Sequence, residues 1–476
     1  MSEIPDALRY SASHSTIRTN RFRLVPTGSS TANPNDTVRV RLPEKSLVRL
    51  SSLSAYFNAT VSGLEAFQPG GVIPTVNWQS ALMPASYKFF RSIKFYVGGA
   101  IASGSLCNNY DQLYHALVVS SADKAWVESR FNEGYRELIS PADDTVLPAV
   151  TLVQNPGVTS KTQYLTCSDF LGLPRCNGGG GVIDTSLYSA VEIEFNMNDI
   201  NFLSAAWAGT ATGAGLNWQL TNFRVDVDCV TSVSPLYVEM MSLRLQEAAP
   251  IRFPYQNFVT VIAQNTGSNR VQVNSQSVDM MLVAPLRADY NQLSNLGGAT
   301  AGGVSNQMQA HRYKFDSYLA STAGGGNEGV LTNNVAALNS YIANEGNGNF
   351  KYQIVVGSDT YPKQIIDHAL MIPDLTINTL YHGSLYSKNL FSSGLLTGTQ
   401  GFFRGFGLAD NFVWINNFSL ESEGWATKRL TGIDTSAQNV DIILNSTLPA
   451  ANYLLAALTT SQLVYDPQSA TVSIVA

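Results

Sequence analysis

The sequence predicts an all-β protein that consists of two similar β-sandwiches in tandem. Three observations lead to this prediction: one phrase is written twice, several strand-like segments recur in the same order, and few segments have the pattern of a helix. The chain has 476 residues, which is too long for one ordinary core and enough for two or three domains.

The repeated phrase is Ile-Asp-Thr-Ser, at residues 183–186 and again at 433–436. In both places it leads into a segment where apolar and polar residues alternate, 191–196 in the first half and 440–445 in the second. A period of two is typical of a strand with one buried face. The opposite face of the second segment includes Ile443, so it is the less polar of the two.

Other strand-like segments also occur in pairs and keep their order along the chain. The pairs are 37–42 with 269–273, 46–61 with 276–286, 93–99 with 352–358, 114–117 with 367–370, and 222–230 with 471–475. The spacing between partners drifts, because loops gain and lose residues more readily than strands do. We infer a duplication, with the two copies joined near residues 232–241.

Helix signals are few. Residues 108–117 place Tyr110, Leu113, Tyr114 and Leu117 on one helical face, and Ser121 is a suitable N-cap for a helix over 121–140. Runs rich in Gly and Asn separate the strands and read as turns and loop tips. No strand–helix–strand rhythm is present, which disfavours a parallel sheet.

Antiparallel sandwiches with very long loops are typical of the jelly roll. The long loops would be 98–190, 288–350 and 372–430, packed into towers or against neighbours. We therefore predict two tandem eight-stranded jelly-roll β-sandwiches with long loops and a few short helices. The predicted divisions are an N-terminal arm over 1–20, a first jelly roll over 21–234 and a second over 235–476.

The chain is poor in charge. Asp, Glu, Lys and Arg make up 13% of it, against roughly 25% in an average soluble protein. Two readings stay open: a β-rich protein with polar loops, or a surface made to lie against copies of itself. The net charge of −6 argues against a protein that coats nucleic acid. The beginning of the chain lacks the layout of a signal peptide, so we expect synthesis in the cytosol.

Catalytic patterns are missing. The histidines show no metal-binding spacing, and there is no nucleophile elbow or phosphate-binding glycine loop. His115 and His368 share a repeated His-Ala-Leu phrase, which we interpret as structural, with a paired functional role as the alternative. Residues 195–201 are a turn rather than a calcium site, and Asp143 and Asp144 read as a solvated turn. The four cysteines form no CxxC pair and read as free thiols. We predict no catalytic residues, no cofactor and no metal.

The first 50 residues are basic, with eight Lys and Arg against four Asp and Glu. Four of these arginines form the candidate functional segment, an arm toward the inner face or a neighbouring subunit: Arg9, Arg18, Arg21 and Arg23. The alternative is the polar face of the first strand. A few arginines hold a polyanion weakly at physiological salt unless many copies act together.

Tandem β-sandwiches, long loops, low charge and no visible catalyst together resemble the double jelly-roll major capsid proteins of tailless icosahedral DNA viruses. That group includes adenovirus-type hexons, virophage and polinton-like capsid proteins, and capsid proteins of membrane-containing phages. The resemblance covers about residues 15–476 and rests on architecture, duplicated segments and size. No single residue of the family can be carried over.

The resemblance implies a structural protein of the virion, not an enzyme, made and assembled in the cytoplasm or nucleus of a host cell. Three chains would form a pseudo-hexameric homotrimer, and neighbouring trimers would tile an icosahedral shell. Further implied partners are a penton or minor capsid protein, with weak contact between the N-terminal arm and an internal membrane or genome.

Two other functions remain as alternatives. One is a double β-sandwich hydrolase acting on glycans, which needs acids that meet in a groove. The other is a sugar-binding fibre or surface protein, which needs exposed tryptophan platforms. The candidates for such platforms, for which burial in a core is the simpler expectation, are Trp78, Trp126, Trp207, Trp218, Trp414 and Trp425.

Overall fold

The structure is a computed structural model, and the part of the chain that it describes is mostly strand. The described residues are 18–62, 79–81, 84–104, 106–121, 158–174, 181–188, 190–203, 205–207, 217–232, 235–247, 250–264, 266, 268–286, 290–291, 293–298, 305–310, 312, 351–366, 414–418, 432–445, 452–469 and 471–475.

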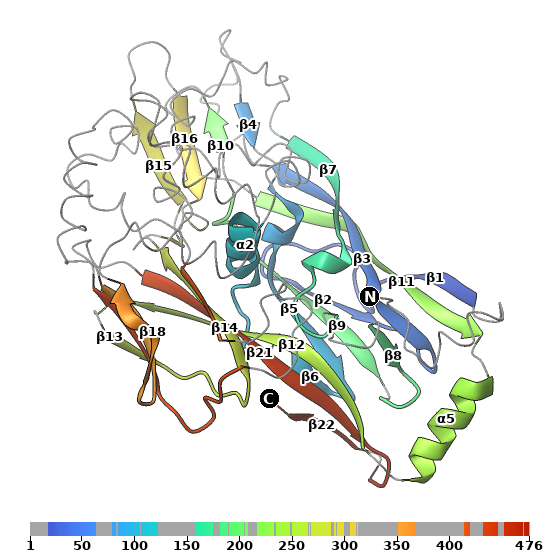
Figure 1. Ribbon diagram of the computed structural model, residues 1–476. Coiled ribbons are helices and arrows are strands. Elements are labelled where there is room, and N and C mark those ends of the chain that lie inside the picture. Colours follow the sequence, from blue (N-terminus) through green and yellow to red (C-terminus); the bar gives the residue numbers. More distant parts are fainter. Residues whose placement is uncertain are drawn as a thin grey trace, which may run out of the picture.

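The first half forms a sandwich of two antiparallel sheets (Figure 1). Sheet A has the order β1-β11-β3-β7 and consists of β1 (Arg18–Leu24), β11 (Asn217–Ser232), β3 (Leu47–Ser62) and β7 (Val158–Leu165), with β8 (Val182–Asp184) beside β3. Sheet B has the order β2-β9-β5-β6 and consists of β2 (Thr37–Arg41), β9 (Val191–Met197), β5 (Phe90–Val97) and β6 (Ala100–Ser103).

The second half repeats this arrangement. Sheet D has the order β12-β21-β14-β19 and consists of β12 (Ile251–Gln264), β21 (Asn452–Asp466), β14 (Val278–Leu286) and β19 (Trp414–Asn417), with β22 (Thr471–Val475) beside β21. Sheet E has the order β13-β20-β17-β18 and consists of β13 (Ser268–Val271), β20 (Val440–Asn445), β17 (Lys351–Val356) and β18 (Asp359–Ile366).

The two halves have the same strand order. If the eight main strands of each half are numbered along the chain, both sandwiches read 1-8-3-6 in one sheet and 2-7-4-5 in the other. The duplication inferred from the sequence is therefore confirmed. One matched pair was wrong: residues 222–230 lie in β11, whose counterpart is β21, whereas residues 471–475 form the additional strand β22. The match of 114–117 with 367–370 lies partly outside the described residues.

Segments expected as long loops contain further structure. Within 98–190 lie β6, helix α2 (Tyr110–Ser121), β7 and β8, so that stretch is not one continuous loop. Strands from both halves also build a small sheet, which Figure 1 shows at one end of the molecule: β15 (Leu293–Gly298), β16 (Ser305–Ala310), β10 (Ala205–Trp207) and β4 (Gln79–Ala81). Residues 372–413 lie outside the described residues.

The remaining described helices are short. Two 3₁₀ turns, η2 (Ser86–Phe89) and η4 (Cys167–Asp169), flank the first core, and α5 (Pro235–Gln246) connects the halves. Among the helices that the structure describes, none has the length and apolar character needed to cross a membrane.

The two sandwiches have different cores. The first is aromatic: the Phe57 ring packs edge-on against Phe89 and Phe90 and lies parallel to Phe223, with centroid distances of 5.9, 5.5 and 5.9 Å. The second core is mainly aliphatic and contains residues such as Val283. In the first core the inward residues of a strand such as β9 alternate with polar ones, whereas β14 and β21 of the second half are buried on both faces.

The repeated phrase makes the same hydrogen bonds in both halves. The buried Thr185 hydroxyl donates to the carbonyls of Pro43 and Ser46, at 2.7 and 2.9 Å, and accepts from the Ser46 N–H at 2.9 Å. Thr435 does the same with the carbonyls of Val273 and Ser275 and the Ser275 N–H, at 2.6, 3.2 and 3.3 Å. Each threonine thus connects, by hydrogen bonds, the segment before the seventh strand of its half (β9 or β20) to the turn after the second strand (β2 or β13).

Removal of either threonine hydroxyl is expected to destabilise the protein. Thr185→Val and Thr435→Val keep the side-chain shape but leave a buried N–H and carbonyls without this partner, so each should lower the free energy of unfolding by about 1–3 kcal/mol. Urea unfolding of the variants measures this change. Ser436→Ala is the control, because Ser436 bonds only locally to Asp434 at an exposed turn. Equal losses in all three variants would contradict the shared role.

Candidate functional site

Residues of both halves share one buried apolar cluster, and sheet D supplies the residues of the second half. Alternate residues of β14 and β21 face two different cores: Met281 and Leu455 belong to the second sandwich, whereas Leu282 and Leu454 belong to the cluster formed with the first. A strand that is apolar on both faces is covered on both faces. Sheet D is therefore an interior layer of the chain.

A buried ion pair crosses this junction. The Arg312 guanidinium donates to both Asp111 carboxylate oxygens, with Nε–Oδ2 2.5 Å and Nη2–Oδ1 3.2 Å, and both side chains are almost fully buried. Asn198 also donates to Asp111 Oδ2 at 2.8 Å, and the Gln112 amide donates to the Arg312 carbonyl at 2.9 Å. This fork geometry is the strong form of an arginine–carboxylate contact. It links α2 of the first half to Arg312 of the second.

Helix α2 carries other polar groups inward, and they are hydrogen-bonded. His115 Nδ1 lies 2.6 Å from the Tyr87 hydroxyl, and the two rings stack. The Tyr110 hydroxyl donates to the Asp169 carbonyl at 2.6 Å, and the Tyr114 hydroxyl donates to the Asp169 carboxylate. The structural interpretation of His115 fits this packing, and His368 lies outside the described residues.

The edge of sheet D is covered by backbone from the first half. The Thr260 N–H of β12 donates to the Leu106 carbonyl at 2.9 Å, and the Gly104 N–H donates to Asn257 Oδ1 at 3.3 Å. The Tyr255 hydroxyl donates to the Ala102 carbonyl. Gly104 has φ +81°, and a Cβ there would lie 2.3 Å from the Ile93 carbonyl oxygen, so only glycine fits where the chain turns toward β12. Residues 102–106 thus protect the outer edge of β12.

The arginines of the predicted arm lie partly in this fold. Arg18 begins β1, and Arg21 and Arg23 face outward from β1 toward β11. Arg21 donates to Ser54 Oγ at 2.8 Å, and Arg23 Nε lies 3.6 Å from Asp226 Oδ1. Long, exposed ion pairs of this kind contribute little stability. Whether these residues contact an inner face or another subunit stays a prediction, and Arg9 lies outside the described residues.

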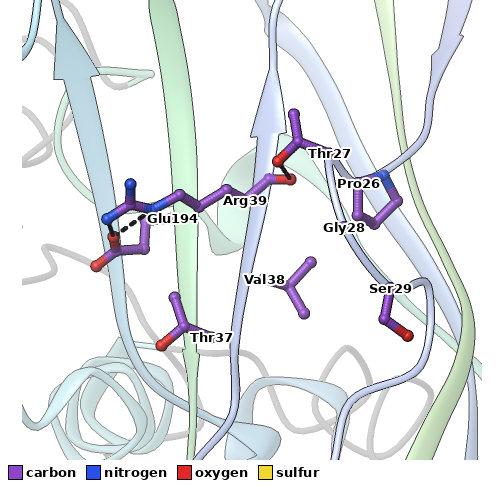
Figure 2. A pocket seen from close by; sticks show the side chains of 8 residues that line it. All are labelled: Pro26, Thr27, Gly28, Ser29, Thr37, Val38, Arg39 and Glu194. Atoms are coloured by element: carbon purple, nitrogen blue, oxygen red, sulfur yellow. Dashed lines mark hydrogen bonds and ion pairs between the residues drawn. The ribbon is translucent and has the colours of Figure 1, made fainter.

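A second feature is an open hollow of about 530 Å³ beside the start of β2 (Figure 2). Its lining residues are Pro26, Thr27, Gly28, Ser29, Thr37, Val38, Arg39 and Glu194. Figure 2 shows Arg39 and Glu194 turned toward each other, with Arg39 Nη2 and Nε 2.5 and 2.8 Å from Glu194 Oε2. Because this carboxylate is already engaged, the hollow offers no free acid or base.

The environment of Glu194 favours its ionised form. Burial acts to raise its pKa, but hydrogen bonds from Asn196 and Arg39, with the positive charges of Arg39 and Lys94, outweigh burial and lower the pKa of Glu194. A carboxyl whose pKa is lower in the folded state contributes stability above its unfolded pKa, about 4.3, and loses it as the pH falls through the folded value.

Glu194→Gln should therefore cost stability at neutral pH and progressively less in acid. Thermal unfolding of wild type and variant between about pH 7 and pH 3 measures the difference, which should shrink below about pH 4.5. Glu192→Gln is the control, since its ion-pair contact with Arg41 is 4.0 Å long. A difference that stays constant over the whole range would contradict the assignment.

The described residues contain no cluster of three His, Cys, Asp or Glu side chains that could hold a metal ion. Burial raises the pKa of the Cys107 thiol to about 12 and that of Cys229 to about 11, so both stay protonated and unreactive at neutral pH. In the segment 195–201, which we predicted to be a turn, the Asn201 N–H donates to Asp199 Oδ1 at 2.8 Å, as is usual for a turn. Trp218 is buried and donates to the Asp199 carbonyl.

Sequence reasoning missed the residues that join the halves. Asp111 and Gln112 lie in a predicted helix, but nothing in the local pattern shows that this face is covered. Arg312 lies 201 positions after its partner Asp111, in the stretch 288–350 that we expected to be a loop. His14, His311, His382, Trp78, Trp126, Trp425, Asp143 and Asp144 lie outside the described residues. Trp207 and Trp414 lie in β10 and β19.

No protein-family profile and no curated protein sequence matches the chain. Solved viral capsid structures do match its fold. PBCV-1 VP54, fitted into a reconstruction of the virophage Sputnik, gives a TM-score of 0.53 at 10% identity, with 96% of each chain covered. A PBCV-1 virus capsid structure gives 0.52 at 9% identity, with 94% of each chain covered. The Sputnik virophage structure gives 0.51 at 9% identity and covers 96% of this chain and 88% of its own.

The fold is a double jelly roll. The likeness extends over 96% of this chain, which includes both sandwiches. The predicted fold class is therefore confirmed. The predicted division of the double jelly roll at 20/21 and 234/235 stays a proposal; β1 begins at Arg18, and residues 233–234 lie outside the described part.

Proposed function

We propose that this double jelly-roll chain is a structural capsid protein that assembles with copies of itself into the shell of a virion. The observation that carries the proposal is one strand order repeated in two sandwiches of a single chain, in a fold shared with solved viral capsid structures. Two equivalent sandwiches per chain let three chains imitate a ring of six, which tiles a hexagonal lattice.

The low charge of the chain supports the same conclusion. Large permanent interfaces exclude charged side chains from their centres, and 13% charged residues is about half the usual fraction. We propose a homotrimer as the unit, with neighbouring trimers and a penton or minor capsid protein as further partners. Assembly would take place in the host cell, with the basic N-terminal segment near an internal membrane or genome.

Sedimentation velocity and negative-stain electron microscopy of the purified chain test this proposal. We expect trimers at micromolar concentration and particles with six lobes. A stable monomer over that range would contradict it.

Among the described residues, neither alternative function has an observation in its favour. The hollow in the described part contains one carboxylate, that of Glu194, and Arg39 engages it, whereas a glycan hydrolase needs two acids across a bound sugar. Trp218 is buried and serves the first core instead of a sugar platform. That the chain lacks catalytic activity stays a prediction, which assays of purified trimers on glycans can check.

A further inference from the structure

The repeated phrase fixes which residues of the two halves correspond. Ile183 pairs with Val48 of β3, and Ile433 pairs with Val278 of β14. In the first half, Val48 of β3 pairs with Cys229 of β11, which pairs with Asn20 of β1. In the second half, Val278 of β14 pairs with Thr459 of β21, which pairs with Asn257 of β12.

Asn20 of β1 therefore corresponds to Asn257 of β12. Three residues later, Arg23 corresponds to Thr260, because neither strand has a register shift in between. In the second half these are the positions that residues 102–106 cover: Asn257 accepts from the Gly104 N–H, and Thr260 donates its N–H to the Leu106 carbonyl. The equivalent edge of β1 has no such cover among the described residues.

The backbone groups on that edge of β1 are available. The Asp228 N–H donates to Ser52 Oγ at 2.8 Å, on the β3 side of β11. Over this stretch β11 pairs with β1 without a register shift, so the backbone groups of Asp226, two residues earlier, also point toward β3. Arg23 lies opposite Asp226 and thus directs its own N–H and carbonyl away from β11. Residues 19–22 are all exposed, and Phe22 is 39% exposed. An open strand edge of this kind is a template for pairing with another chain.

Comparison of the two halves also identifies the segment of the second half that corresponds to residues 102–106. In each half a glycine with positive φ, Gly98 or Gly357, turns strand 4 into strand 5. Counted back from these glycines, Phe95 corresponds to Ile354; Phe95 pairs with Ser103 and Ile354 pairs with Tyr361. The segment that follows Ser103, residues 104–106, therefore corresponds to the part of β18 that follows Tyr361, residues 362–366. Strand β18 is the outermost strand of sheet E in the described part, and Lys363 is well exposed. Within one chain β1 and β18 lie on opposite sides (Figure 1).

We propose that the open edge of β1 is the docking site for residues 362–366 of β18 from a second copy of this chain. The contact repeats, between chains, the contact that residues 102–106 make with β12 within a chain. This docking proposal rests on the proposed capsid function and adds to it the two surfaces, β1 and β18, through which copies of the chain bind each other. Each copy offers one β1 edge and one β18 edge, so the contact runs head to tail and closes after three copies if it matches the angle between the halves.

The contact at β12 within a chain is apolar, whereas the proposed contact at β1 between chains is polar. On the outer face beside β12, the second half has apolar residues such as Leu282 and Ala456, which are buried within the chain. The corresponding residues of the first half are Ser54 and Asp226, beside Arg23. A polar version of the same surface keeps the free chain from aggregating and makes the contact between copies sensitive to salt.

An engineered disulfide tests the proposal directly. Asn20→Cys together with Lys363→Cys places one thiol at the position equivalent to Asn257 and the other in the segment equivalent to residues 104–106, where Gly104 is in hydrogen-bond contact with Asn257. Under mild oxidation we expect dimer and trimer bands on a non-reducing gel, absent from each single variant and removed by reductant. Monomer bands only, from a preparation that sediments as a trimer, would overturn this docking site and leave the capsid proposal intact.

A second variant tests the backbone contact. Arg23→Pro removes an N–H that bonds to nothing in sheet A, so it should leave the monomer folded and weaken the trimer at least tenfold, measured by sedimentation. Arg23→Ala is the control, because it removes the charge and keeps the N–H. Equal trimer affinity in both variants would overturn the proposal. A wild-type chain that sediments as a monomer would overturn it together with the proposed function.

Discussion

Arg312→Ala is expected to lower the free energy of unfolding by about 3–5 kcal/mol, one of the two largest losses that we predict for a single side chain. The substitution leaves the carboxylate of Asp111 buried and without its fork of two N–H donors. A buried carboxylate that loses its cationic partner is expensive to keep desolvated, and the hydrogen bond from Asn198 brings no positive charge. Because this pair joins the halves, the loss should also uncouple them. Urea unfolding, followed by tryptophan fluorescence and by circular dichroism, measures both effects.

The matched control is Arg270→Ala. Arg270 also faces an aspartate on a neighbouring strand, with Nε 3.2 Å from Asp441 Oδ1, but its side chain is 64% exposed. We expect a loss below about 1 kcal/mol there. Similar losses in the two variants would show that burial of the Asp111 pair is not what sets its contribution.

Phe57→Ala should destabilise the first sandwich by about 3–5 kcal/mol. The ring is fully buried in sheet A and contacts Phe89, Phe90 and Phe223, so truncation removes three aromatic contacts and opens a cavity between the two sheets. Thermal unfolding should show a lower midpoint and a smaller enthalpy.

Tyr164→Ala is the comparison for this second variant. Tyr164 lies on β7, the strand next to Phe57, but on the outer face of sheet A, where its ring is 48% exposed and 6.3 Å from that of Tyr56. We expect a loss of about 1 kcal/mol or less. A larger loss for Tyr164 than for Phe57 would mean that the outer face, and not the core, limits the stability of the sheet.

Much of the fold follows from the sequence because duplication makes each half a check on the other. The alternation in 191–196 and 440–445 is local, so it identifies β9 and β20 without any tertiary information. The match of 222–230 with 471–475 was wrong because β21 is apolar on both faces and carries no alternation, whereas the short strand β22 does. Because β21 is buried between two cores, its sequence lacks the alternation of apolar and polar residues that identifies a strand with one exposed face.

The junction between the halves could not be predicted in the same way. Asp111 looks like a solvent-facing residue of an amphipathic helix, because local periodicity cannot show that an arginine 201 positions away in the sequence will bind it. Arg21 and Arg23 were singled out for their charge, whereas the feature that matters for the docking proposal is the open backbone edge beneath them. Composition identifies charge and says nothing about which strand ends a sheet.

The threonine that is bonded in the same manner in both sandwiches also has a historical consequence. Thr185 and Thr435 hold matching partners although the turns they fasten differ in length, Pro43–Ser46 in one copy and Val273–Ser275 in the other. We infer that this contact was present before the duplication that produced the long chain. A single-sandwich ancestor, reconstructed at half the present size, should already carry Ile-Asp-Thr-Ser at the same point.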